Sequence, residues 1–373
     1  MKVLMNTDTL GGVWTYSLTL AAEITRRGGE VALVTAGRPL SRDQIHALEQ
    51  LRSVHVYETG YRVEWMQDAW DDVDALGQRM LQIAADLRPD LIHLNDYSHG
   101  ALPWQQPVVV VGHSCVLSWF ASTSGSSPGE LWAHYRRRVR EGLAGADVVV
   151  APTPWMLQRL EEMYGPLGRT RVIANGHDMS LVTYAAKEKL IFSAGRLWDR
   201  AKNLTVLAHA ASKVEWPMYV AGEAQHPESR SFAHLAGVHA VGVLSPDQMR
   251  DWYARSSIYA LPARYEPFGL TVLEAAAAGC ALVLSDIDSL RQSWDRAAVF
   301  VPPDDSDAWA NCLNELIDDA DRRNGLGVAA RERARDFTAT RMGDEYMTVY
   351  KELIGEQRGT GRKATQGELS CAS

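Results

Sequence analysis

The chain has 373 residues, of which 46% are hydrophobic and 23% charged, and its formal net charge is -8. That length is long for one hydrophobic core and suits two domains, and the composition is ordinary for a globular protein. The acidic balance argues against sequence-independent nucleic-acid binding, because such binding requires a surplus of basic side chains.

Hydropathy and cysteine usage bear on where the protein works. No apolar run approaches the roughly 18 residues that span a bilayer. The four cysteines, Cys115, Cys280, Cys312 and Cys371, have no metal-ligand spacing. We therefore expect a reduced, cytoplasmic protein. The basic run 136–140 is either a solvated helix face or a contact for an anionic membrane or acceptor, so association with the inner face of the membrane stays open.

In the first half of the chain, short apolar runs alternate with amphipathic segments of helix length. Runs this rich in Val, Ile and Leu are typical of parallel strands covered on both faces. The predicted strands are 2–7, 31–36, 54–58, 90–95, 107–112, 146–151 and 170–174. The predicted helices are 13–27, 41–51, 70–87, 129–143 and 153–164. Repeated β–α units of this kind predict an open, doubly wound sheet.

A second β–α series follows a polar stretch near 178–188, which we interpret as an interdomain linker. Its predicted strands are 190–194, 218–221, 239–243, 257–261, 281–285 and 298–301. The sequence thus predicts an α/β protein with two Rossmann-like doubly wound domains, 1–180 and 181–337, that face each other across a cleft. A last helix, about 338–354, is expected to pack back on the first domain. The tail 355–373 has little to bury and is expected to be disordered.

Two carboxylates eight positions apart flank a strand-to-helix turn in the second series. Glu266 follows the strand 257–261, and Glu274 lies in the Ala-rich helix that begins near Thr271. Free backbone N–H groups at a helix N-terminus favour an anionic ligand. One carboxylate is thus placed for sugar hydroxyls and the other for ribose hydroxyls, which predicts a nucleotide-sugar site. The amides expected to meet the phosphate between them are those of Phe268, Gly269 and Leu270.

Two basic residues, Arg196 and Lys202, lie in the loop after Gly195, at the end of the first strand of the second series. A guanidinium fork with a mobile ammonium can clamp a diphosphate and stabilise the charge that builds on it as it departs. The alternative is a pair of solvated surface cations. Gly11 and Gly12, after the first strand of the chain, either bring backbone N–H groups to phosphate or form a tight turn without a ligand.

Polar residues also end two strands of the first series. His113 either contacts donor hydroxyls and stabilises positive charge through its carbonyl, or is a structural histidine. Asn95 and Asp96 either meet an acceptor hydroxyl or form a simple turn. Trp119 either stacks on a sugar or belongs to the core or its rim. The DxD spacing at 286–288 is that of metal-dependent sugar transferases of another fold; with no carboxylate partner in sight, we expect no metal site.

Taken together, these segments resemble the retaining glycosyltransferases of family 4, which have the two-domain GT-B fold. The resemblance runs from about residue 2 to about 354. Its strongest part is 266–279, which matches the family's E-x7-E followed by an Ala-rich helix and Gly. The segments 195–203 and 172–178 support it, and Gly11-Gly12 and His113 match weaker positions. Gln292 departs from the pattern, since the family often carries Glu there.

The resemblance implies a role for each half and for the site residues. Domain 1–180 would bind the acceptor and domain 181–337 the nucleotide-sugar donor. Arg196 and Lys202 would hold the diphosphate, Glu266 the hexose and Glu274 the ribose. The residues expected close to the other parts of the donor are Gly12 at the phosphate, His113 at the transferred sugar, and Gly222, Glu223 and Leu244 at the base.

We therefore expect an enzyme that moves a hexose from a nucleoside-diphosphate sugar to an acceptor hydroxyl with retention, by metal-independent same-face attack. UDP-glucose is favoured and GDP-mannose comes next, and the acceptor is a small molecule, a glycan or a lipid-linked sugar. The expected catalytic residues are His113, Arg196, Lys202 and Glu266, with no cofactor. A nucleotide-sugar-binding protein without turnover and a GT-B-fold epimerase or phosphorylase stay open. An NAD-dependent dehydrogenase lacks its GxGxxG, and a glycosidase would need no nucleotide.

Overall fold

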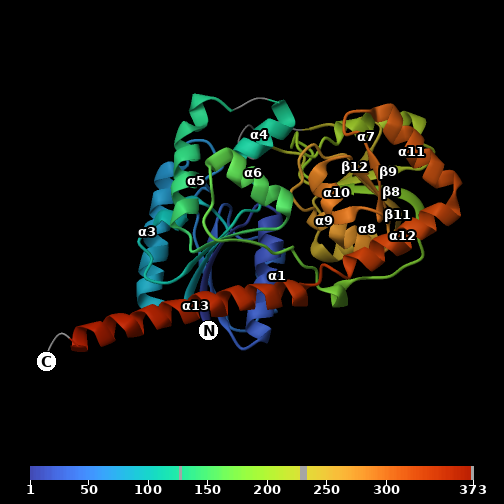
Figure 1. The fold of residues 1–373 in the computed structure, drawn as a ribbon. Coiled ribbons are helices and arrows are strands. Elements are labelled where there is room, and N and C mark those ends of the chain that lie inside the picture. The colour runs from blue at the N-terminus through green and yellow to red at the C-terminus, as the bar shows by residue number, and fades with distance from the viewer. Residues whose placement is uncertain (126–127, 227–232, 371–373) are drawn as a thin grey trace.

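The computed structural model describes residues 1–125, 128–226 and 233–370, which form two α/β halves, each built on a parallel sheet (Figure 1). The N-terminal sheet has seven strands in the order β3-β2-β1-β4-β5-β6-β7. The C-terminal sheet has six strands in the order β10-β9-β8-β11-β12-β13. The strand order reverses beside β1 and beside β8, and such a reversal is where doubly wound sheets bind ligands. The predicted fold class is confirmed.

Every strand predicted from the apolar runs is present, with ends that shift by two residues or fewer. The N-terminal strands are β1 Lys2–Asp8, β2 Glu30–Ala36, β3 Val54–Glu58, β4 Leu91–Leu94, β5 Val108–Val111, β6 Val148–Ala151 and β7 Thr170–Val172. The C-terminal strands are β8 Glu188–Ala194, β9 Met218–Ala221, β10 His239–Gly242, β11 Ser256–Leu261, β12 Ala281–Ser285 and β13 Ala298–Val301. The central strands β4, β5, β6, β11 and β12 are buried along their whole length, which explains their unbroken apolar character.

Helices cover both faces of each sheet. In the N-terminal half they are α1 Gly12–Arg26, α2 Arg42–Glu49, α3 Trp70–Leu87, α4 Val116–Ser124, α5 Ala133–Gly145 and α6 Pro154–Tyr164. In the C-terminal half they are α7 Thr205–Ala210, α8 Pro246–Arg255, α9 Leu270–Ala277, α10 Asp288–Trp294, α11 Ser306–Asp318 and α12 Ala320–Ala334. Helix α5 begins later than the predicted residue 129, because Glu130–Trp132 form a separate 3-10 turn.

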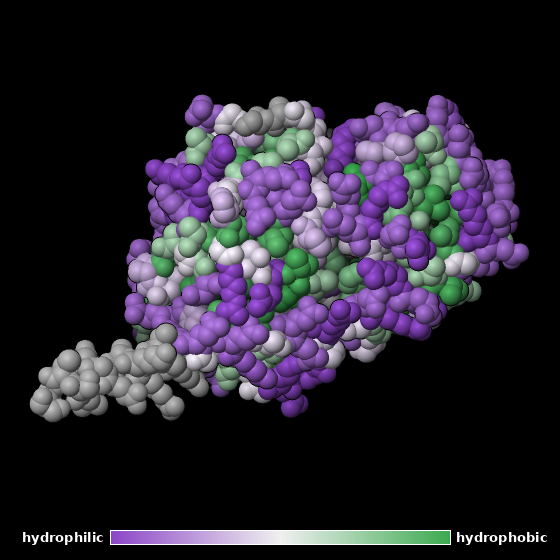
Figure 2. Space-filling view, viewed as in Figure 1, coloured by the Kyte–Doolittle hydropathy of each residue, from purple (hydrophilic) through white to green (hydrophobic). Residues whose placement is uncertain are grey.

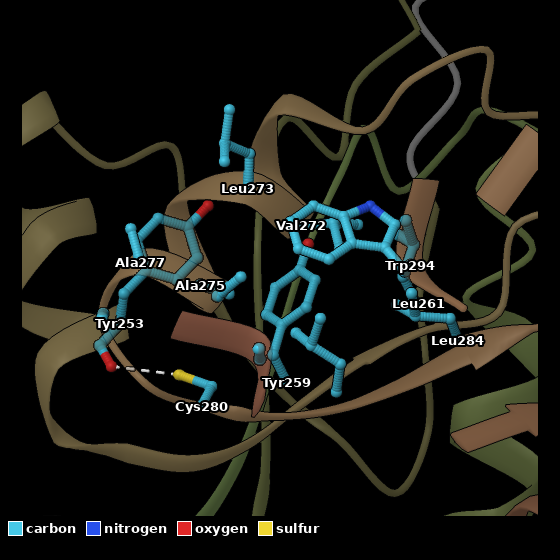
Figure 3. Close-up of a cluster of buried hydrophobic side chains, with 14 of the residues drawn as sticks. Tyr253, Tyr259, Leu261, Val272, Leu273, Ala275, Ala277, Cys280, Leu284 and Trp294 are labelled. Carbon is cyan, nitrogen blue, oxygen red and sulfur yellow. Dashed lines mark hydrogen bonds between the residues drawn. The ribbon is translucent and has the colours of Figure 1, made fainter. Parts of the chain in front are cut away.

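Helix α9 stands on a tightly packed part of the C-terminal core. Tyr259, Trp294 and Cys280 are fully buried around it, and the Cys280 thiol donates a hydrogen bond to the Tyr253 carbonyl (Figure 3). A close-packed core of this kind transmits little motion. The turn that precedes α9, which carries Glu266, is therefore anchored on a rigid base.

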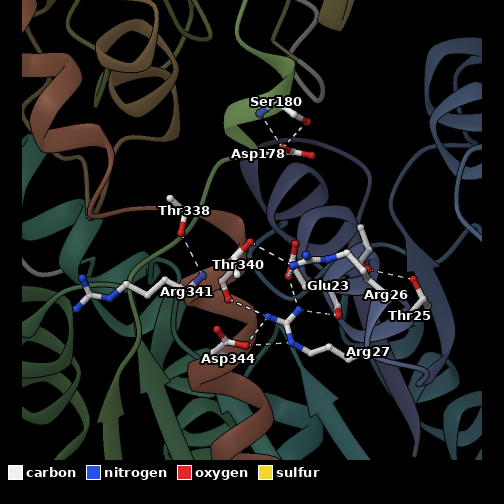
Figure 4. A network of polar contacts seen from close by, with 11 residues as sticks. Glu23, Thr25, Arg26, Arg27, Asp178, Ser180, Thr338, Thr340, Arg341 and Asp344 are labelled. Carbon is white, nitrogen blue, oxygen red and sulfur yellow. Dashed lines mark hydrogen bonds and ion pairs between the residues drawn. The ribbon is translucent and has the colours of Figure 1, made fainter.

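The last helix, α13 Ala339–Ser370, returns from the C-terminal half and lies along the N-terminal half (Figure 1). It buries five apolar or aromatic side chains in the N-terminal core: Met342, Tyr346, Val349, Tyr350 and Leu353. At its start, Arg27, the residue that follows α1, pairs with Asp344, and Arg26 donates to the Thr340 hydroxyl (Figure 4). The crossing is tied to the linker by a parallel bridge between His177 and Thr338.

Helix α13 continues into the segment 355–373 that the sequence analysis expected to be disordered; residues 371–373 lie outside the described part. Arg169 explains the first turn of this extension, since its guanidinium pairs with both Glu352 and Glu356. Within the described residues no helix is long and apolar enough to cross a membrane. The face of the molecule in Figure 2 is mostly hydrophilic, with only small apolar areas.

Candidate active site

The N-termini of α1 and α9 meet where the two halves face each other. Leu270 lies so close to Gly12 that a Cβ atom added to the glycine would be 3.4 Å from the leucine Cδ1. Neither helix has a capping side chain: the residues at the two N-cap positions are Gly11 and Gly269. Two sets of free backbone N–H groups, each at the positive end of a helix dipole, therefore converge from opposite halves.

The turn before α9 is held in place from both halves. Gly269 has a φ of +88°, and a Cβ atom there would lie 2.9 Å from Val272, so glycine is required. The Ser289 hydroxyl donates to the Glu266 carbonyl at 2.7 Å, and the Thr153 hydroxyl donates to the Pro267 carbonyl at 3.0 Å. Thr153 belongs to the N-terminal half, so this turn is part of the contact between the halves.

Both predicted clamp cations lie in the loop that follows β8, and each has a carboxylate partner. Lys202 Nζ lies 2.5 Å from Glu266 Oε2, and an Arg196 guanidinium nitrogen lies 2.6 Å from Asp199 Oδ2. The stem of Lys202 packs against Gly195, where a Cβ atom would be 3.0 Å from the lysine Cγ. The side chains of Lys202 and Arg196 are 20% and 37% exposed, so both cations are only partly shielded from solvent.

The sequence analysis did not assign a role to Asp199, which is buried in the same loop. Its carboxylate also accepts hydrogen bonds from the Ala201 amide at 2.9 Å and from Trp119 Nε1 at 3.2 Å. Burial acts to raise the pKa of Asp199, but the neighbouring Arg196 and Lys202 hold it below its usual value. The sequence signal that could have identified Asp199 is an acidic residue three positions after Arg196. Trp119, which was predicted to contact the acceptor, donates its indole N–H to Asp199 and so links the two halves.

Glu274 lies half-buried in α9, eight positions after Glu266. Burial raises the pKa of its carboxyl group to about 7. Burial raises the pKa of the Tyr259 phenol, and the charges of Glu266 and Glu274 add to this effect. A carboxyl group with a pKa near neutrality can accept hydrogen bonds from a diol once it is ionised.

The residues predicted near the base lie at the ends of β9 and β10. Gly222 has a φ of +143°, and a Cβ atom there would lie 2.0 Å from the Gly195 carbonyl oxygen, so the two loops touch through backbone. The Glu223 carboxylate pairs with Arg38 of the N-terminal half at 2.8 Å. Leu244 is partly buried against the C-terminal core, just before α8.

On the N-terminal side, His113 is bound to Asn95 through a 2.8 Å contact between its Nε2 and the amide Oδ1. Burial lowers the pKa of His113 to about 3. The Asn95 amide nitrogen donates to the Asn6 carbonyl at 2.7 Å. The side chain predicted to meet an acceptor is therefore engaged with internal partners.

Asp96 is the second residue predicted to contact the acceptor substrate. Among the described residues, only one of its two carboxylate oxygens is hydrogen-bonded. Its Oδ2 lies 2.6 Å from both the Asn6 amide nitrogen and His99 Nδ1. Its Oδ1 is buried without a hydrogen-bond partner among the described residues.

Two further carboxyl groups belong to this N-terminal side. Glu64 accepts hydrogen bonds from the backbone N–H groups of Tyr97 at 3.0 Å and Ser98 at 2.9 Å. Burial, assisted by the charge of Asp96, raises the pKa of Glu64 to about 7. Burial also raises the pKa of Asp8, against the effects of the Leu10 amide and of Arg196. No sequence pattern pointed to Glu64, because it lies in an irregular segment and its partner Tyr97 is 33 positions further along the chain.

Two side chains of the C-terminal half, Tyr265 and Gln292, form three hydrogen bonds with the N-terminal half. The Tyr265 hydroxyl accepts from the Cys115 amide at 3.1 Å and lies 2.8 Å from the Ser118 hydroxyl. The Gln292 side-chain oxygen accepts from the Trp155 amide at 3.0 Å. Gln292 thus has a structural role at the position where the sequence departs from the family pattern.

The DxD segment lies outside this constellation. Asp286 forms an ion pair with Arg291, which holds the pKa of the carboxyl group below its usual value. Asp288 is the first residue of α10. Within the described residues no group of three or more His, Cys, Asp or Glu side chains could hold a metal ion.

Two facing Rossmann-like halves, with free helix N-termini, paired cations and carboxylates between them, define the GT-B class of glycosyltransferases. Residues 10–181 match the family described as Glycosyltransferase Family 4, and residues 188–319 match the one described as Glycosyl transferases group 1. The chain belongs to glycosyltransferase family 4, and the family resemblance seen in the sequence is confirmed.

Relatives and solved structures agree with this assignment. A D-inositol 3-phosphate glycosyltransferase of Corynebacterium diphtheriae is 25% identical, over 91% of this chain and 89% of its own. A glycogen synthase of Mycobacterium tuberculosis is 28% identical, over 69% and 67%. Sucrose-phosphate synthase from Thermosynechococcus elongatus has a TM-score of 0.81 at 18% identity, covering 95% of this chain and 100% of that one. Anabaena Alr3699/HepE in complex with UDP-glucose has a TM-score of 0.74 at 17% identity, with the same coverage.

Proposed function

We propose that this glycosyltransferase moves a hexose from a nucleoside-diphosphate sugar, UDP-glucose first and GDP-mannose next, to an acceptor hydroxyl with retention of configuration. The observation that carries the proposal is the convergence of two uncapped helix N-termini, at Gly12 and Leu270, with the cations Arg196 and Lys202. Such a set of donors and charges suits a diphosphate without a metal ion. The solved complex of HepE with UDP-glucose supports UDP-glucose as the first donor to test.

In this mechanism the diphosphate is both leaving group and base. The bond between the anomeric carbon and the phosphate oxygen breaks, and its electron pair goes to the diphosphate. The acceptor oxygen bonds to the same face of the anomeric carbon while its proton passes to the departing phosphate oxygen. Arg196, Lys202 and the helix N-termini stabilise the charge on the diphosphate. Glu266 accepts hydrogen bonds from hexose hydroxyls, and closure of the two halves around Tyr265 excludes water.

The acceptor side supports a hydroxyl-rich acceptor without phosphate. The charge of Asp96 acts on both Asp8 and Glu64, and the Oδ1 of Asp96, which has no hydrogen-bond partner among the described residues, can accept from a hydroxyl. In their ionised form these carboxyl groups oppose a phosphorylated acceptor by like-charge repulsion. Inositol should therefore be a better acceptor than inositol 3-phosphate, the substrate type in the name of the 25% identical relative.

The first experiment is a binding panel of UDP, GDP, ADP and TDP on the purified protein without metal, by thermal shift and calorimetry. A ligand that binds only the native state raises the unfolding midpoint. Selective stabilisation by UDP, followed by NMR of the product anomer with UDP-glucose as donor, would support the proposal. No binding of any nucleotide at millimolar concentration would refute it, and binding without cleavage under any acceptor would favour a nucleotide-sugar-binding protein.

A further inference from the structure

A line of hydrogen bonds runs from the last helix to His113 through the core of the N-terminal half. The Tyr350 hydroxyl of α13 lies 2.7 Å from His93 Nδ1. His93 Nε2 lies 3.3 Å from Asn95 Oδ1, and the same oxygen lies 2.8 Å from His113 Nε2. Tyr350 and His93 are fully buried. Buried polar groups away from helix and sheet ladders are costly unless they are hydrogen-bonded, so this arrangement calls for a functional explanation.

The chemistry of Asn95 determines the direction of these hydrogen bonds. Its Nδ2 lies 2.7 Å from the Asn6 carbonyl oxygen and 3.2 Å from the Ser17 hydroxyl. A carbonyl oxygen can only accept, so the amide nitrogen must face Asn6 and the amide oxygen must face the two imidazoles. An amide oxygen also only accepts. His113, at 2.8 Å, must therefore carry a proton on Nε2. His93 does so as well when the Tyr16 hydroxyl, which also lies 3.3 Å from its Nε2, accepts rather than donates.

The other end of the line agrees with this assignment. With its proton on Nε2, neutral His93 has a bare Nδ1, which needs a donor. The Tyr350 hydroxyl supplies that donor at 2.7 Å. Burial lowers the pKa of His93 and of His113 to about 3, so both rings are neutral at physiological pH. Every donor from Tyr350 to His113 then has an acceptor.

We propose that Asn95, His93 and Tyr350 are positioning residues that hold His113 as the neutral tautomer with its proton on Nε2. Its Nδ1 can then only accept, and it accepts a hydrogen bond from a hydroxyl group of the transferred sugar. This inference rests on the proposed function, in which His113 contacts that sugar. A neutral ring at this place does not oppose the positive charge that develops on the sugar in an oxocarbenium-like transition state. Ring orientation and tautomer are commonly set by partners behind a functional histidine.

The long separation along the chain gives the inference a structural consequence. Tyr350 and His93 are 257 positions apart, and Tyr350 reaches the N-terminal half only because α13 returns after the whole C-terminal half. The environment of His113 is thus completed by the last helix.

The test measures the tautomer and the rate separately in the full chain. Protein labelled with 15N-histidine, with His113→Gln to assign the signal, should show neutral, Nε2-protonated His113 in long-range 1H–15N spectra. UDP release from UDP-glucose without acceptor gives the rate, and calorimetry gives the affinity for UDP. Asn95→Ala should mix the tautomers and lower kcat about 10- to 100-fold, and Tyr350→Phe should lower it about 3- to 10-fold, with little change in UDP affinity.

Tyr346→Phe is the matched control. Tyr346 lies on the same helix, is also fully buried and touches the His93 ring, but among the described residues its hydroxyl makes no hydrogen bond to His93, Asn95 or His113. Its loss should leave kcat unchanged. Equal losses in Tyr350→Phe and Tyr346→Phe, or a wild-type His113 with its proton on Nδ1, would overturn the inference. The spectrum of the wild type decides this even where a variant does not fold. A wild type that neither binds UDP nor cleaves UDP-glucose would refute the proposed function instead. The 15N-histidine spectrum would still show which nitrogen of His113 carries the proton.

Discussion

The Lys202 ammonium lies 2.5 Å from the Glu266 carboxylate, although the two residues are 64 positions apart in the chain. Their side chains are 20% and 12% exposed, so water screens the pair only in part. The cation assigned to the diphosphate and the carboxylate assigned to the hexose thus neutralise each other before any donor arrives. A bound donor would place its diphosphate on one partner and its sugar hydroxyls on the other, which couples the two parts of the substrate.

Replacing Lys202 with Met should lower kcat by roughly 10²- to 10³-fold, because a charge that stabilises the departing diphosphate is removed. Glu266→Gln should lower kcat/KM for the sugar nucleotide while leaving UDP affinity nearly unchanged, since UDP has no hexose. Steady-state kinetics and calorimetry measure the two effects. Lys213→Met is the control, because Lys213 forms an exposed surface ion pair with Asp307. Turnover near that of the wild type in Lys202→Met would remove Lys202 from the site.

Nucleotide affinity should depend on pH through Glu274. Ribose hydroxyls donate to the ionised carboxylate, and burial raises the pKa of this group to about 7. Ionisation therefore rises with pH, and UDP should bind about tenfold more weakly at pH 6 than at pH 8. Calorimetry across this range measures the slope, and Glu274→Gln should flatten it. An identical slope in the variant would show that another group is responsible.

The same pKa shift has a consequence for stability. Glu274 loses its proton near its ordinary pKa of 4.5 in the unfolded chain but only near 7 in the folded protein. Between these values the unfolded state releases a proton that the native state keeps. The contribution of Glu274 to the free energy of unfolding should therefore fall as pH rises from about 4.5 to 7 and stay constant above that. Thermal midpoints of the wild type and Glu274→Gln should converge at low pH.

Removing divalent metal should leave transfer intact. Asp286 is held by Arg291 on the surface, so the DxD segment offers no free pair of carboxylates. Activity after treatment with EDTA should match that of the untreated protein, and Asp286→Asn should reduce it by less than about twofold. Loss of activity with EDTA, restored by Mn²⁺ but not in Asp286→Asn, would establish the metal site that we do not expect.

Gly222→Ala should destabilise the protein by roughly 2–4 kcal/mol, because it combines a strained φ with a clash against backbone. The added Cβ atom would lie 2.0 Å from the Gly195 carbonyl oxygen, at a φ of +143°. Gly325→Ala is the matched control: it lies exposed in α12 with no atom within 4 Å of an added Cβ, so it should stabilise by about 1 kcal/mol. Thermal midpoints of both variants give the comparison. A Gly222→Ala midpoint at or above the wild type would mean that the two loops can move apart.

Elements whose signal is local were predictable from the sequence. The Val-rich strands at 108–111 and 148–151 are buried on both faces, and burial of that kind leaves a continuous apolar run. The turn before α9 was readable because an apolar strand ends before it and an Ala-rich helix follows it, and the structure places Gly269 there with a φ of +88°. Motifs at strand ends could be assigned to one cleft because parallel strands present their carboxyl ends at one edge.

Partners of side chains could not be predicted in this way. The sequence shows an acidic residue at position 199, but its contact with Trp119 depends on how the two halves pack against each other. The first turn of α13 beyond residue 354 rests on a long-range pair, Arg169 with Glu356, which no local pattern in the sequence shows.

By itself, then, the sequence determined the two parallel sheets, the order of the motifs along them and the family, since hydrophobic periodicity and turn chemistry act over a few residues. Only the tertiary structure decided which charges are paired, which carboxyl groups titrate near neutrality, and which ring nitrogen of His113 carries the proton. The physical reason is distance along the chain: these properties arise from contacts such as Glu64 with Tyr97 and His93 with Tyr350, 33 and 257 positions apart, which exist only when the elements have packed.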